Sequence, residues 1–133
     1  MDEKEQAEIT LRVPGERAYA LVIRTALGGV AILKDLDVDA MDDLRTAADE
    51  ACDCLLHQGR PVESLCVTVH DGEGQLTVSL ESSFSGAKTG EDCAENTAIS
   101  QAVLETLVPH VALSLTPCGC VRRIDLTMPK AAV

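Results

Sequence analysis

The sequence predicts an α+β fold, a two-layer sandwich in which helices cover one face of a mainly antiparallel β-sheet. The first observation is the order of the periodic segments, which runs strand, helix, helix, two strands, helix, two strands. The second is that the later strands come in adjacent pairs joined by short glycine-containing turns, as in β-hairpins. Helices grouped on one face of such a sheet allow both layers to bury their apolar sides, which favours this class of fold.

Length and composition limit the number of domains. With 133 residues, 46% of them hydrophobic, the chain is long enough for one core and too short for two. The same composition excludes an intrinsically disordered chain. We expect a single domain over residues 1–133, with its core between about residues 8 and 129.

Charge and aromatic content argue against nucleic-acid binding. The 11 Lys and Arg residues are outnumbered by 22 Asp and Glu residues, and the net charge of −11 at pH 7 repels polyanions. Tyr19 and Phe84 are the only aromatic residues, whereas base stacking uses several. We therefore expect no nucleic-acid partner.

No export signal or membrane span is predicted. The first ten residues are acidic and polar, whereas a secretion signal is basic and then apolar. The most apolar stretch, residues 18–33, contains Arg24 and is shorter than the roughly 20 residues that span a bilayer. We expect a cytoplasmic protein.

The N-terminal segment predicts one strand and one helix. Residues 8–13 alternate polar and apolar as a half-buried strand does, and Pro14-Gly15 ends the alternation. From Glu16 to Leu33 the apolar residues recur every three or four positions, as on one side of a helix. The predicted inner face of this helix consists of Tyr19, Val22, Ile23, Ala26, Val30 and Leu33.

A second helix is predicted after the acidic connector at 35–39. Asp39 or Asp42 is expected to cap its start, and Gly59-Arg60-Pro61 to end it near His57, because proline cannot continue a helix. Its predicted inner face consists of Met41, Leu44, Ala47 or Ala48, Ala51 and Leu55.

A hairpin and a loop follow the second helix. Residues 64–69 and 75–80 alternate, and Asp71-Gly72 between them is a strong hairpin signal. Residues 82–96 are polar and small, which predicts a surface loop.

The C-terminal part predicts a third helix and a second hairpin. The helix is expected from Thr97 to Leu107 or Val108. Residues 111–115 and 121–128 then alternate around a turn containing Cys118-Gly119-Cys120.

The second predicted helix carries Glu50-Ala51-Cys52, and Cys54 follows Glu50 by one turn on the same side. The order of elements and the spacing around this tripeptide resemble the anti-sigma factor and serine-protein kinase family of the histidine-kinase-like (GHKL, Bergerat-fold) ATPases. The resemblance covers about residues 8–129. It implies the two-layer fold predicted above, with an ATP site between the second helix and the sheet.

The resemblance implies roles for residues of the second helix. In this family Glu-Ala-x-x-Asn supplies a glutamate that polarises the attacking hydroxyl or water and an asparagine that holds magnesium. Glu50 matches the glutamate and is the catalytic candidate, whereas Cys54 occupies the asparagine position, and a neutral thiol is a poor ligand for a hard cation. A register shifted by one residue would instead place Asp49 and Asp53 at these two positions and His57 at a frequent family histidine.

The other nucleotide-binding positions implied by the resemblance are also changed. Leu80 occupies the position of the adenine-reading aspartate, and Ser82 that of the glycine after it. Ala98 and Ser100 correspond to the glycine-rich lid and helix start, and Gly119 alone keeps a family glycine. Several changes among contacts to one ligand favour an impaired or lost ATP site, so we expect no cofactor.

The resemblance also implies protein partners. These are a sigma factor or a STAS-type anti-anti-sigma protein, together with a homodimer through the first helix and its flanking strand. The acidic charge suits a basic partner, since complementary fields speed association. The candidate contacts on the first helix and the connector are Glu16, Arg17, Arg24 and Asp35 to Asp39.

Two alternatives remain open. The first is an active serine-protein kinase with a divergent pocket, in which Glu50 is the base, Asp53 is the metal ligand, and ATP with magnesium is bound. The second is a thiol or metal sensor that uses Cys118 and Cys120. The six cysteines, expected to be thiols in a reducing compartment, are Cys52, Cys54, Cys66, Cys93, Cys118 and Cys120.

Overall fold

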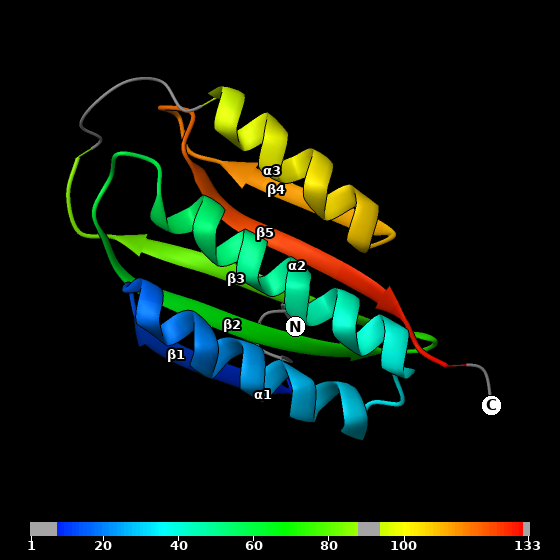
Figure 1. The fold of residues 1–133 in the computed structure, drawn as a ribbon. Helices are drawn as coiled ribbons and strands as arrows, with labels where there is room; N and C mark the ends of the chain where they lie inside the picture. The colour runs from blue at the N-terminus through cyan, green and yellow to red at the C-terminus, as the bar shows by residue number, and fades with distance from the viewer. Residues whose placement is uncertain (1–7, 88–93, 132–133) are drawn as a thin grey trace.

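A computed structural model describes residues 8–87 and 94–131. Within these residues, five strands form one antiparallel sheet in the order β1-β2-β3-β5-β4, and three α-helices cover one of its faces (Figure 1). The predicted α+β two-layer fold is confirmed. The elements are β1 (Ile9–Pro14), α1 (Ala20–Leu33), α2 (Val38–Leu56), β2 (Val62–Gly72), β3 (Gln75–Phe84), α3 (Ala94–Leu107), β4 (His110–Leu115) and β5 (Val121–Pro129).

The core lies between the helices and the inner face of the sheet. Helix α2 lies between α1 and α3 across the middle of the sheet (Figure 1). The side chains that meet there are almost all aliphatic, so the core depends on leucine, isoleucine, valine and alanine packing. Each fully buried leucine or isoleucine stabilises the fold by about 1.5–3 kcal/mol. The fully buried large side chains include Ile23, Leu27, Leu44, Leu55, Leu65, Leu76, Leu80, Leu104, Ile124 and Leu126.

The inner face of α1 differs from the prediction. Ile23 and Val30 are buried as expected, but Leu27 and Ala31 complete the buried stripe. The other predicted inner residues, Tyr19, Val22, Ala26 and Leu33, are exposed. Because α1 is apolar on nearly all sides, the three-to-four-residue spacing did not identify which side faces the sheet.

The cap of helix α2 is Asp37, two residues before the first of the predicted caps. Asp37 has extended backbone angles, and its side chain accepts a hydrogen bond from the Ala40 amide at 2.8 Å. The predictions of Asp39 and Asp42 as caps are wrong, because both lie inside the helix, where the backbone is already helical. The predicted inner face is confirmed, with Met41 half-buried and the remaining residues buried.

The first hairpin is longer than predicted. Gly72 pairs with Gln75, so the turn is Glu73-Gly74, and Gly74 has a φ of 74°, which favours glycine. The predicted turn residue Asp71 instead pairs with Leu76 within the ladder. The Asp71 side chain forms ion pairs with Lys34 and Lys130, which anchor the end of α1 and the end of β5 to β2.

The predicted loop at 82–96 is shorter in the structure. Strand β3 continues to Phe84, and α3 begins at Ala94 rather than Thr97. Cys93 lies outside the described residues. The second hairpin has the predicted bounds within one residue at each end. In the described part of the chain, no helix has both the length and the apolar character needed to cross a membrane.

Candidate functional site

A hollow of about 380 Å³ lies between the C-terminal end of α2 and the N-terminal half of α3. It brings together three of the predicted site residues, Asp53, Cys54 and Ser100. Glu50, Leu80, Ser82, Ala98 and Gly119 do not line it. The lining residues are Arg17, Asp53, Cys54, His57, Gln58, Asn96, Thr97, Ile99 and Ser100.

Asp53 is occupied by contacts within the chain. Its carboxylate forms an ion pair with Arg17, which lies in the 3-10 turn before α1. Its backbone carbonyl accepts a hydrogen bond from the His57 Nδ1 atom at 3.0 Å. Because the Asp53 and Arg17 side chains remain 36% and 61% exposed, such a pair stabilises the fold by at most about 1 kcal/mol. To bind a cation, Asp53 would have to release Arg17.

Glu50 and Ser100 form a direct contact between α2 and α3. The Ser100 hydroxyl donates a hydrogen bond to Glu50 Oε2 at 3.2 Å. The structure therefore brings together two predicted site residues that are 50 positions apart. In this arrangement the Glu50 carboxylate holds α3 against α2.

The α2 cysteines lie in the core. Cys54 is 7% exposed and Cys52 is 1% exposed. Burial, reinforced by the nearby Asp49 charge, raises the pKa of Cys52 to about 12, so this thiol stays protonated at neutral pH. In the portions of the chain that the structure describes, no three His, Cys, Asp or Glu side chains cluster so as to hold a metal ion.

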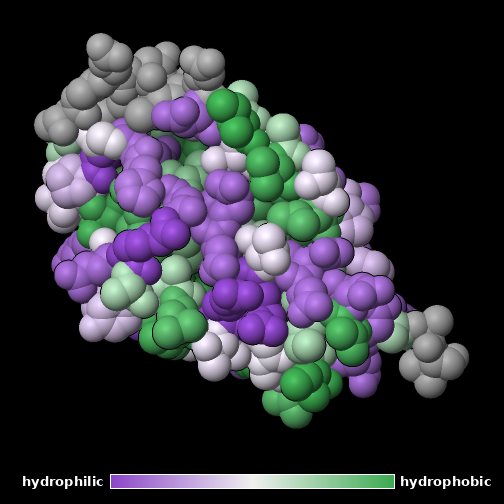
Figure 2. Space-filling model, viewed as in Figure 1, coloured by the Kyte–Doolittle hydropathy of each residue, from purple (hydrophilic) through white to green (hydrophobic). Residues whose placement is uncertain are grey.

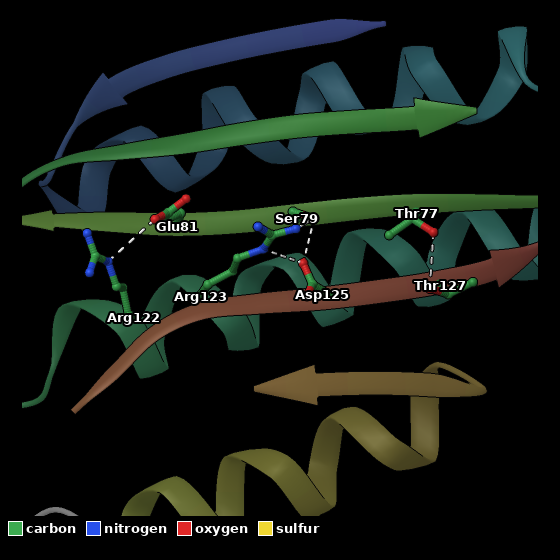
Figure 3. Close-up of polar contacts among 7 residues, drawn as sticks. All are labelled: Thr77, Ser79, Glu81, Arg122, Arg123, Asp125 and Thr127. Atoms are coloured by element: carbon green, nitrogen blue, oxygen red, sulfur yellow. Dashed lines mark hydrogen bonds and ion pairs between the residues drawn. The ribbon is translucent and has the colours of Figure 1, made fainter. Parts of the chain in front are cut away.

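The residue at the predicted adenine-reading position, Leu80, belongs to the hydrophobic core. Leu80 is fully buried on the helix-facing side of β3. Ser82, also buried on that side, donates a hydrogen bond from its hydroxyl to the Arg122 carbonyl at 3.2 Å. Glu81 points to the opposite face of the sheet, where it pairs with Arg122 at 3.5 Å (Figure 3). No carboxylate of β3 therefore reaches the hollow between α2 and α3.

The two remaining predicted positions are also separate from the hollow. Ala98 is exposed on α3. Gly119, in the turn between β4 and β5, has a φ of 87° and open space around its Cα. The positive φ accounts for glycine at this position.

Gln58 is a site residue that the sequence did not identify. Its side chain is 2% exposed and connects the end of α2 to the start of β5. Its amide nitrogen donates to the Val121 carbonyl at 2.8 Å and to the Leu55 carbonyl at 3.2 Å, and its oxygen accepts from the Val121 amide at 2.5 Å. A lone glutamine after a helix carries no pattern that distinguishes it from a surface residue.

The outer face of the sheet carries a separate polar network (Figure 3). Asp125 accepts hydrogen bonds from the Ser79 hydroxyl at 2.5 Å and from Arg123 Nε at 2.7 Å, and Arg123 also donates to Ser79 at 3.2 Å. Thr77 and Thr127 bond to each other beside it at 3.2 Å. The helices lie on the other side of the sheet, so these groups satisfy one another rather than a packing partner.

The fold has a counterpart among solved structures. Within the described residues, three helices lie on one face of a five-stranded antiparallel sheet, which is the two-layer arrangement that the resemblance predicted. A crystal structure of the RsbU and RsbW domains of Rv1364c from Mycobacterium tuberculosis has the same fold, with a TM-score of 0.66 and 17% sequence identity. The match covers 94% of this chain and 34% of that one.

A sequence match gives the more particular relationship. The anti-sigma-F factor RsbW of Mycobacterium tuberculosis, in strains CDC 1551 and H37Rv, is 31% identical to this chain over 70 residues. The matched segment covers 53% of this chain and 42% of that relative, so the match spans less than half the relative's length. No family model matches the sequence. Over about half of its length the chain is therefore similar to an anti-sigma factor, and the predicted resemblance is confirmed.

Proposed function

We propose that this protein is a cytoplasmic anti-sigma-factor-type regulator that acts by binding a protein partner, with an ATP site that is impaired or lost. The observation that carries the proposal is the 31% identity over 70 residues to an anti-sigma-F factor. The partner is a sigma factor or a STAS-type anti-anti-sigma protein. Regulation then depends on which of these two partners occupies the binding surface.

The residues of the site support the loss of nucleotide binding. The purine anchor is replaced by Leu80, a fully buried aliphatic side chain that cannot accept a hydrogen bond. The magnesium anchor is replaced by Cys54, a buried thiol. Asp53, the substitute ligand, is paired with Arg17. The residues present do not fit ATP with magnesium, and we propose no resident cofactor.

The surface of α1 supports a homodimer through α1 and β1. Leu21, Ile32 and Leu33 are 68%, 69% and 75% exposed, and Val22 is 44% exposed. Figure 2 shows the helix-bearing face of the molecule, on which hydrophobic residues gather along α1 and α3 on either side of a hydrophilic middle. Large apolar side chains that cluster in water favour burial against a second surface.

Some of the candidate partner contacts already contact other residues of the chain. Arg17 and Arg24 form ion pairs with Asp53 and Asp49 of α2, and Asp37 caps α2. The remaining acidic residues among these candidates are exposed, and they are Glu16, Asp35 and Asp39. They provide the negative charge that would attract a basic partner.

A pull-down with this chain from extract of its native cell tests the proposal. We expect recovery of a sigma factor or a STAS-type protein, identified by mass spectrometry. The recovered protein should bind the purified chain without ATP, because partner binding is proposed not to require nucleotide. Recovery of neither class of protein would contradict the proposal.

A second candidate is an active serine-protein kinase with a divergent pocket. It is favoured by the placement of Asp53 and Ser100 on the hollow, with Glu50 in contact with Ser100. Incubation with labelled ATP, magnesium and a STAS-type protein separates the two candidates. Transfer of label to the STAS-type protein that is abolished by Glu50→Gln would support the kinase. Absence of transfer supports the binding protein.

A further inference from the structure

The turn between β4 and β5 brings two cysteine sulfur atoms together. Cys118 is exposed and Cys120 is 2% exposed, yet their Sγ atoms are 3.5 Å apart. Gly119 between them has a φ of 87° and no neighbouring atoms within 4 Å of an added Cβ. Since an S–S bond is about 2 Å long, the sulfur atoms need to approach by only about 1.5 Å to bond.

The neighbours of Cys118 stabilise its thiolate. The Thr116 hydroxyl lies 3.1 Å from the Cys118 sulfur, and Arg60 Nη1 donates to the same sulfur at 3.8 Å. Hydrogen bonding by Thr116, and next by Cys120, lowers the pKa of Cys118 to about 7. A thiol whose pKa is close to the ambient pH is the most effective attacking group in thiol–disulfide exchange.

The other described cysteines lack this environment. Cys52 and Cys54 are buried in α2, and burial raises the pKa of Cys52. Cys66 is half-buried on β2. Thiolate formation and exposure together select the site of oxidation. Among the cysteines that the structure describes, they select Cys118.

We propose that Cys118 and Cys120 are a redox-active pair that closes reversibly to a disulfide. With a small disulfide as oxidant, the Cys118 thiolate attacks one of its sulfur atoms, breaks its S–S bond and releases one thiolate. Cys120 then loses its proton to solvent and attacks Cys118, and this step releases the second thiol. The protein loses two electrons and two protons, and the small disulfide becomes two thiols.

The structure around the turn confines the change to a few residues. Val121, the residue after Cys120, is held at both its amide and its carbonyl by Gln58. Arg60 also donates to the Gly86 carbonyl at 2.7 Å and lies over the Phe84 ring, and neither contact involves the Cys118 sulfur. Closure therefore alters the turn and removes the thiolate beside Arg60 without displacing β5.

Oxidation of the reduced chain with oxidised glutathione, followed by peptide mass mapping, tests the proposal. We expect a peptide with a Cys118–Cys120 disulfide, two hydrogen atoms lighter than the reduced form, that dithiothreitol converts back. Cys120→Ser should stop at one glutathione attached to Cys118. Cys118→Ser should form no disulfide in this turn.

Two further variants complete the test. Cys66→Ser is the matched control and should oxidise as the parent chain does. Thr116→Val, which removes the hydroxyl next to the sulfur, should slow the reaction several-fold at pH 7 and much less at pH 9. A disulfide between Cys118 and any other cysteine, or six thiols remaining after oxidation, would overturn the proposal.

Discussion

The hollow between α2 and α3 and the exposed face of α1 differ in how their side chains are satisfied. In the hollow, Asp53 pairs with Arg17, and Gln58 bonds to the Val121 backbone. On α1, by contrast, Ile32 and Leu33 are 69% and 75% exposed. Polar groups that already bond to one another gain little from a ligand, whereas exposed apolar groups gain from burial. The difference favours the α1 surface, rather than the hollow, for the proposed binding of a second protein surface.

The largest expected effect comes from placing a carboxylate at position 80, where the resemblance implies the adenine-reading aspartate. Leu80→Asp places a carboxylate in the apolar core, where no hydrogen-bond partner is available, and should lower the free energy of unfolding by about 4 kcal/mol or more. Chemical denaturation measures the change. The control Leu80→Met keeps the volume and should cost less than about 1.5 kcal/mol. A Leu80→Asp variant that is as stable as the parent and binds ATP would contradict the assignment of position 80 to the core.

Substitutions of Gln58 measure how much its hydrogen bonds to Val121 stabilise the fold. Gln58→Ala leaves the buried Val121 amide and carbonyl without their partner and should lower the free energy of unfolding by about 2–4 kcal/mol. Gln58→Glu keeps an oxygen for the Val121 amide, but it loses the donor to the Val121 carbonyl and buries a carboxyl group, so it should also lower the free energy of unfolding. A loss below about 0.5 kcal/mol for Gln58→Ala, typical of surface sites, would contradict this role.

The α1 surface is tested by a charge placed at its most exposed apolar position. Leu33→Asp should weaken self-association about tenfold or more, which is roughly 1.4 kcal/mol, and leave the monomer's stability nearly unchanged. Sedimentation velocity measures the association. Ala102→Asp, at an exposed position on α3, is the matched control and should associate as the parent does. A parent chain that stays monomeric at high concentration would refute the dimer.

The smallest expected effect concerns the ion pairs that anchor the end of α1. Hydrogen bonds from Lys130, and next from Lys34, lower the pKa of Asp71 below its ordinary value of 3.8. A carboxylate whose pKa is depressed on folding stabilises the fold above its unfolded pKa, and this contribution is lost as the pH falls through its folded pKa.

Asp71→Asn should therefore lower the Tm slightly at pH 7, and the difference from the parent should shrink as the pH falls below about 4. Thermal unfolding followed by circular dichroism from pH 7 to pH 2 measures it. A difference that stays constant over this range would show that the Asp71 charge has no part in anchoring α1.

Most of the fold was predictable because alternation and hairpin turns are local signals. The two hairpins and the inner face of α2 follow from such patterns. The inner face of α1 does not, because its apolar residues surround the helix. The cap of α2 was misplaced because the acidic connector offers several aspartates, and only the backbone angles distinguish Asp37.

The candidate site was less predictable than the fold. The positions of Leu80 and Cys54 on the strand and the helix followed from periodicity. The Glu50–Ser100 contact and the Gln58–Val121 bonds depend on how α2 packs against α3 and β5, over separations of 50 and 63 residues. No single-sequence pattern reports such contacts. The resemblance implied which positions would contact a ligand, and the packing shows which of these side chains are buried in the core.

Calorimetric titration of this chain with ATP and magnesium tests the loss of the nucleotide site most directly. We expect no saturable heat at micromolar concentrations, because Leu80 and Cys54 lie in the core and Asp53 is paired with Arg17. One-to-one binding of ATP with a micromolar Kd would contradict the loss of the site, and the kinase would then be the better assignment.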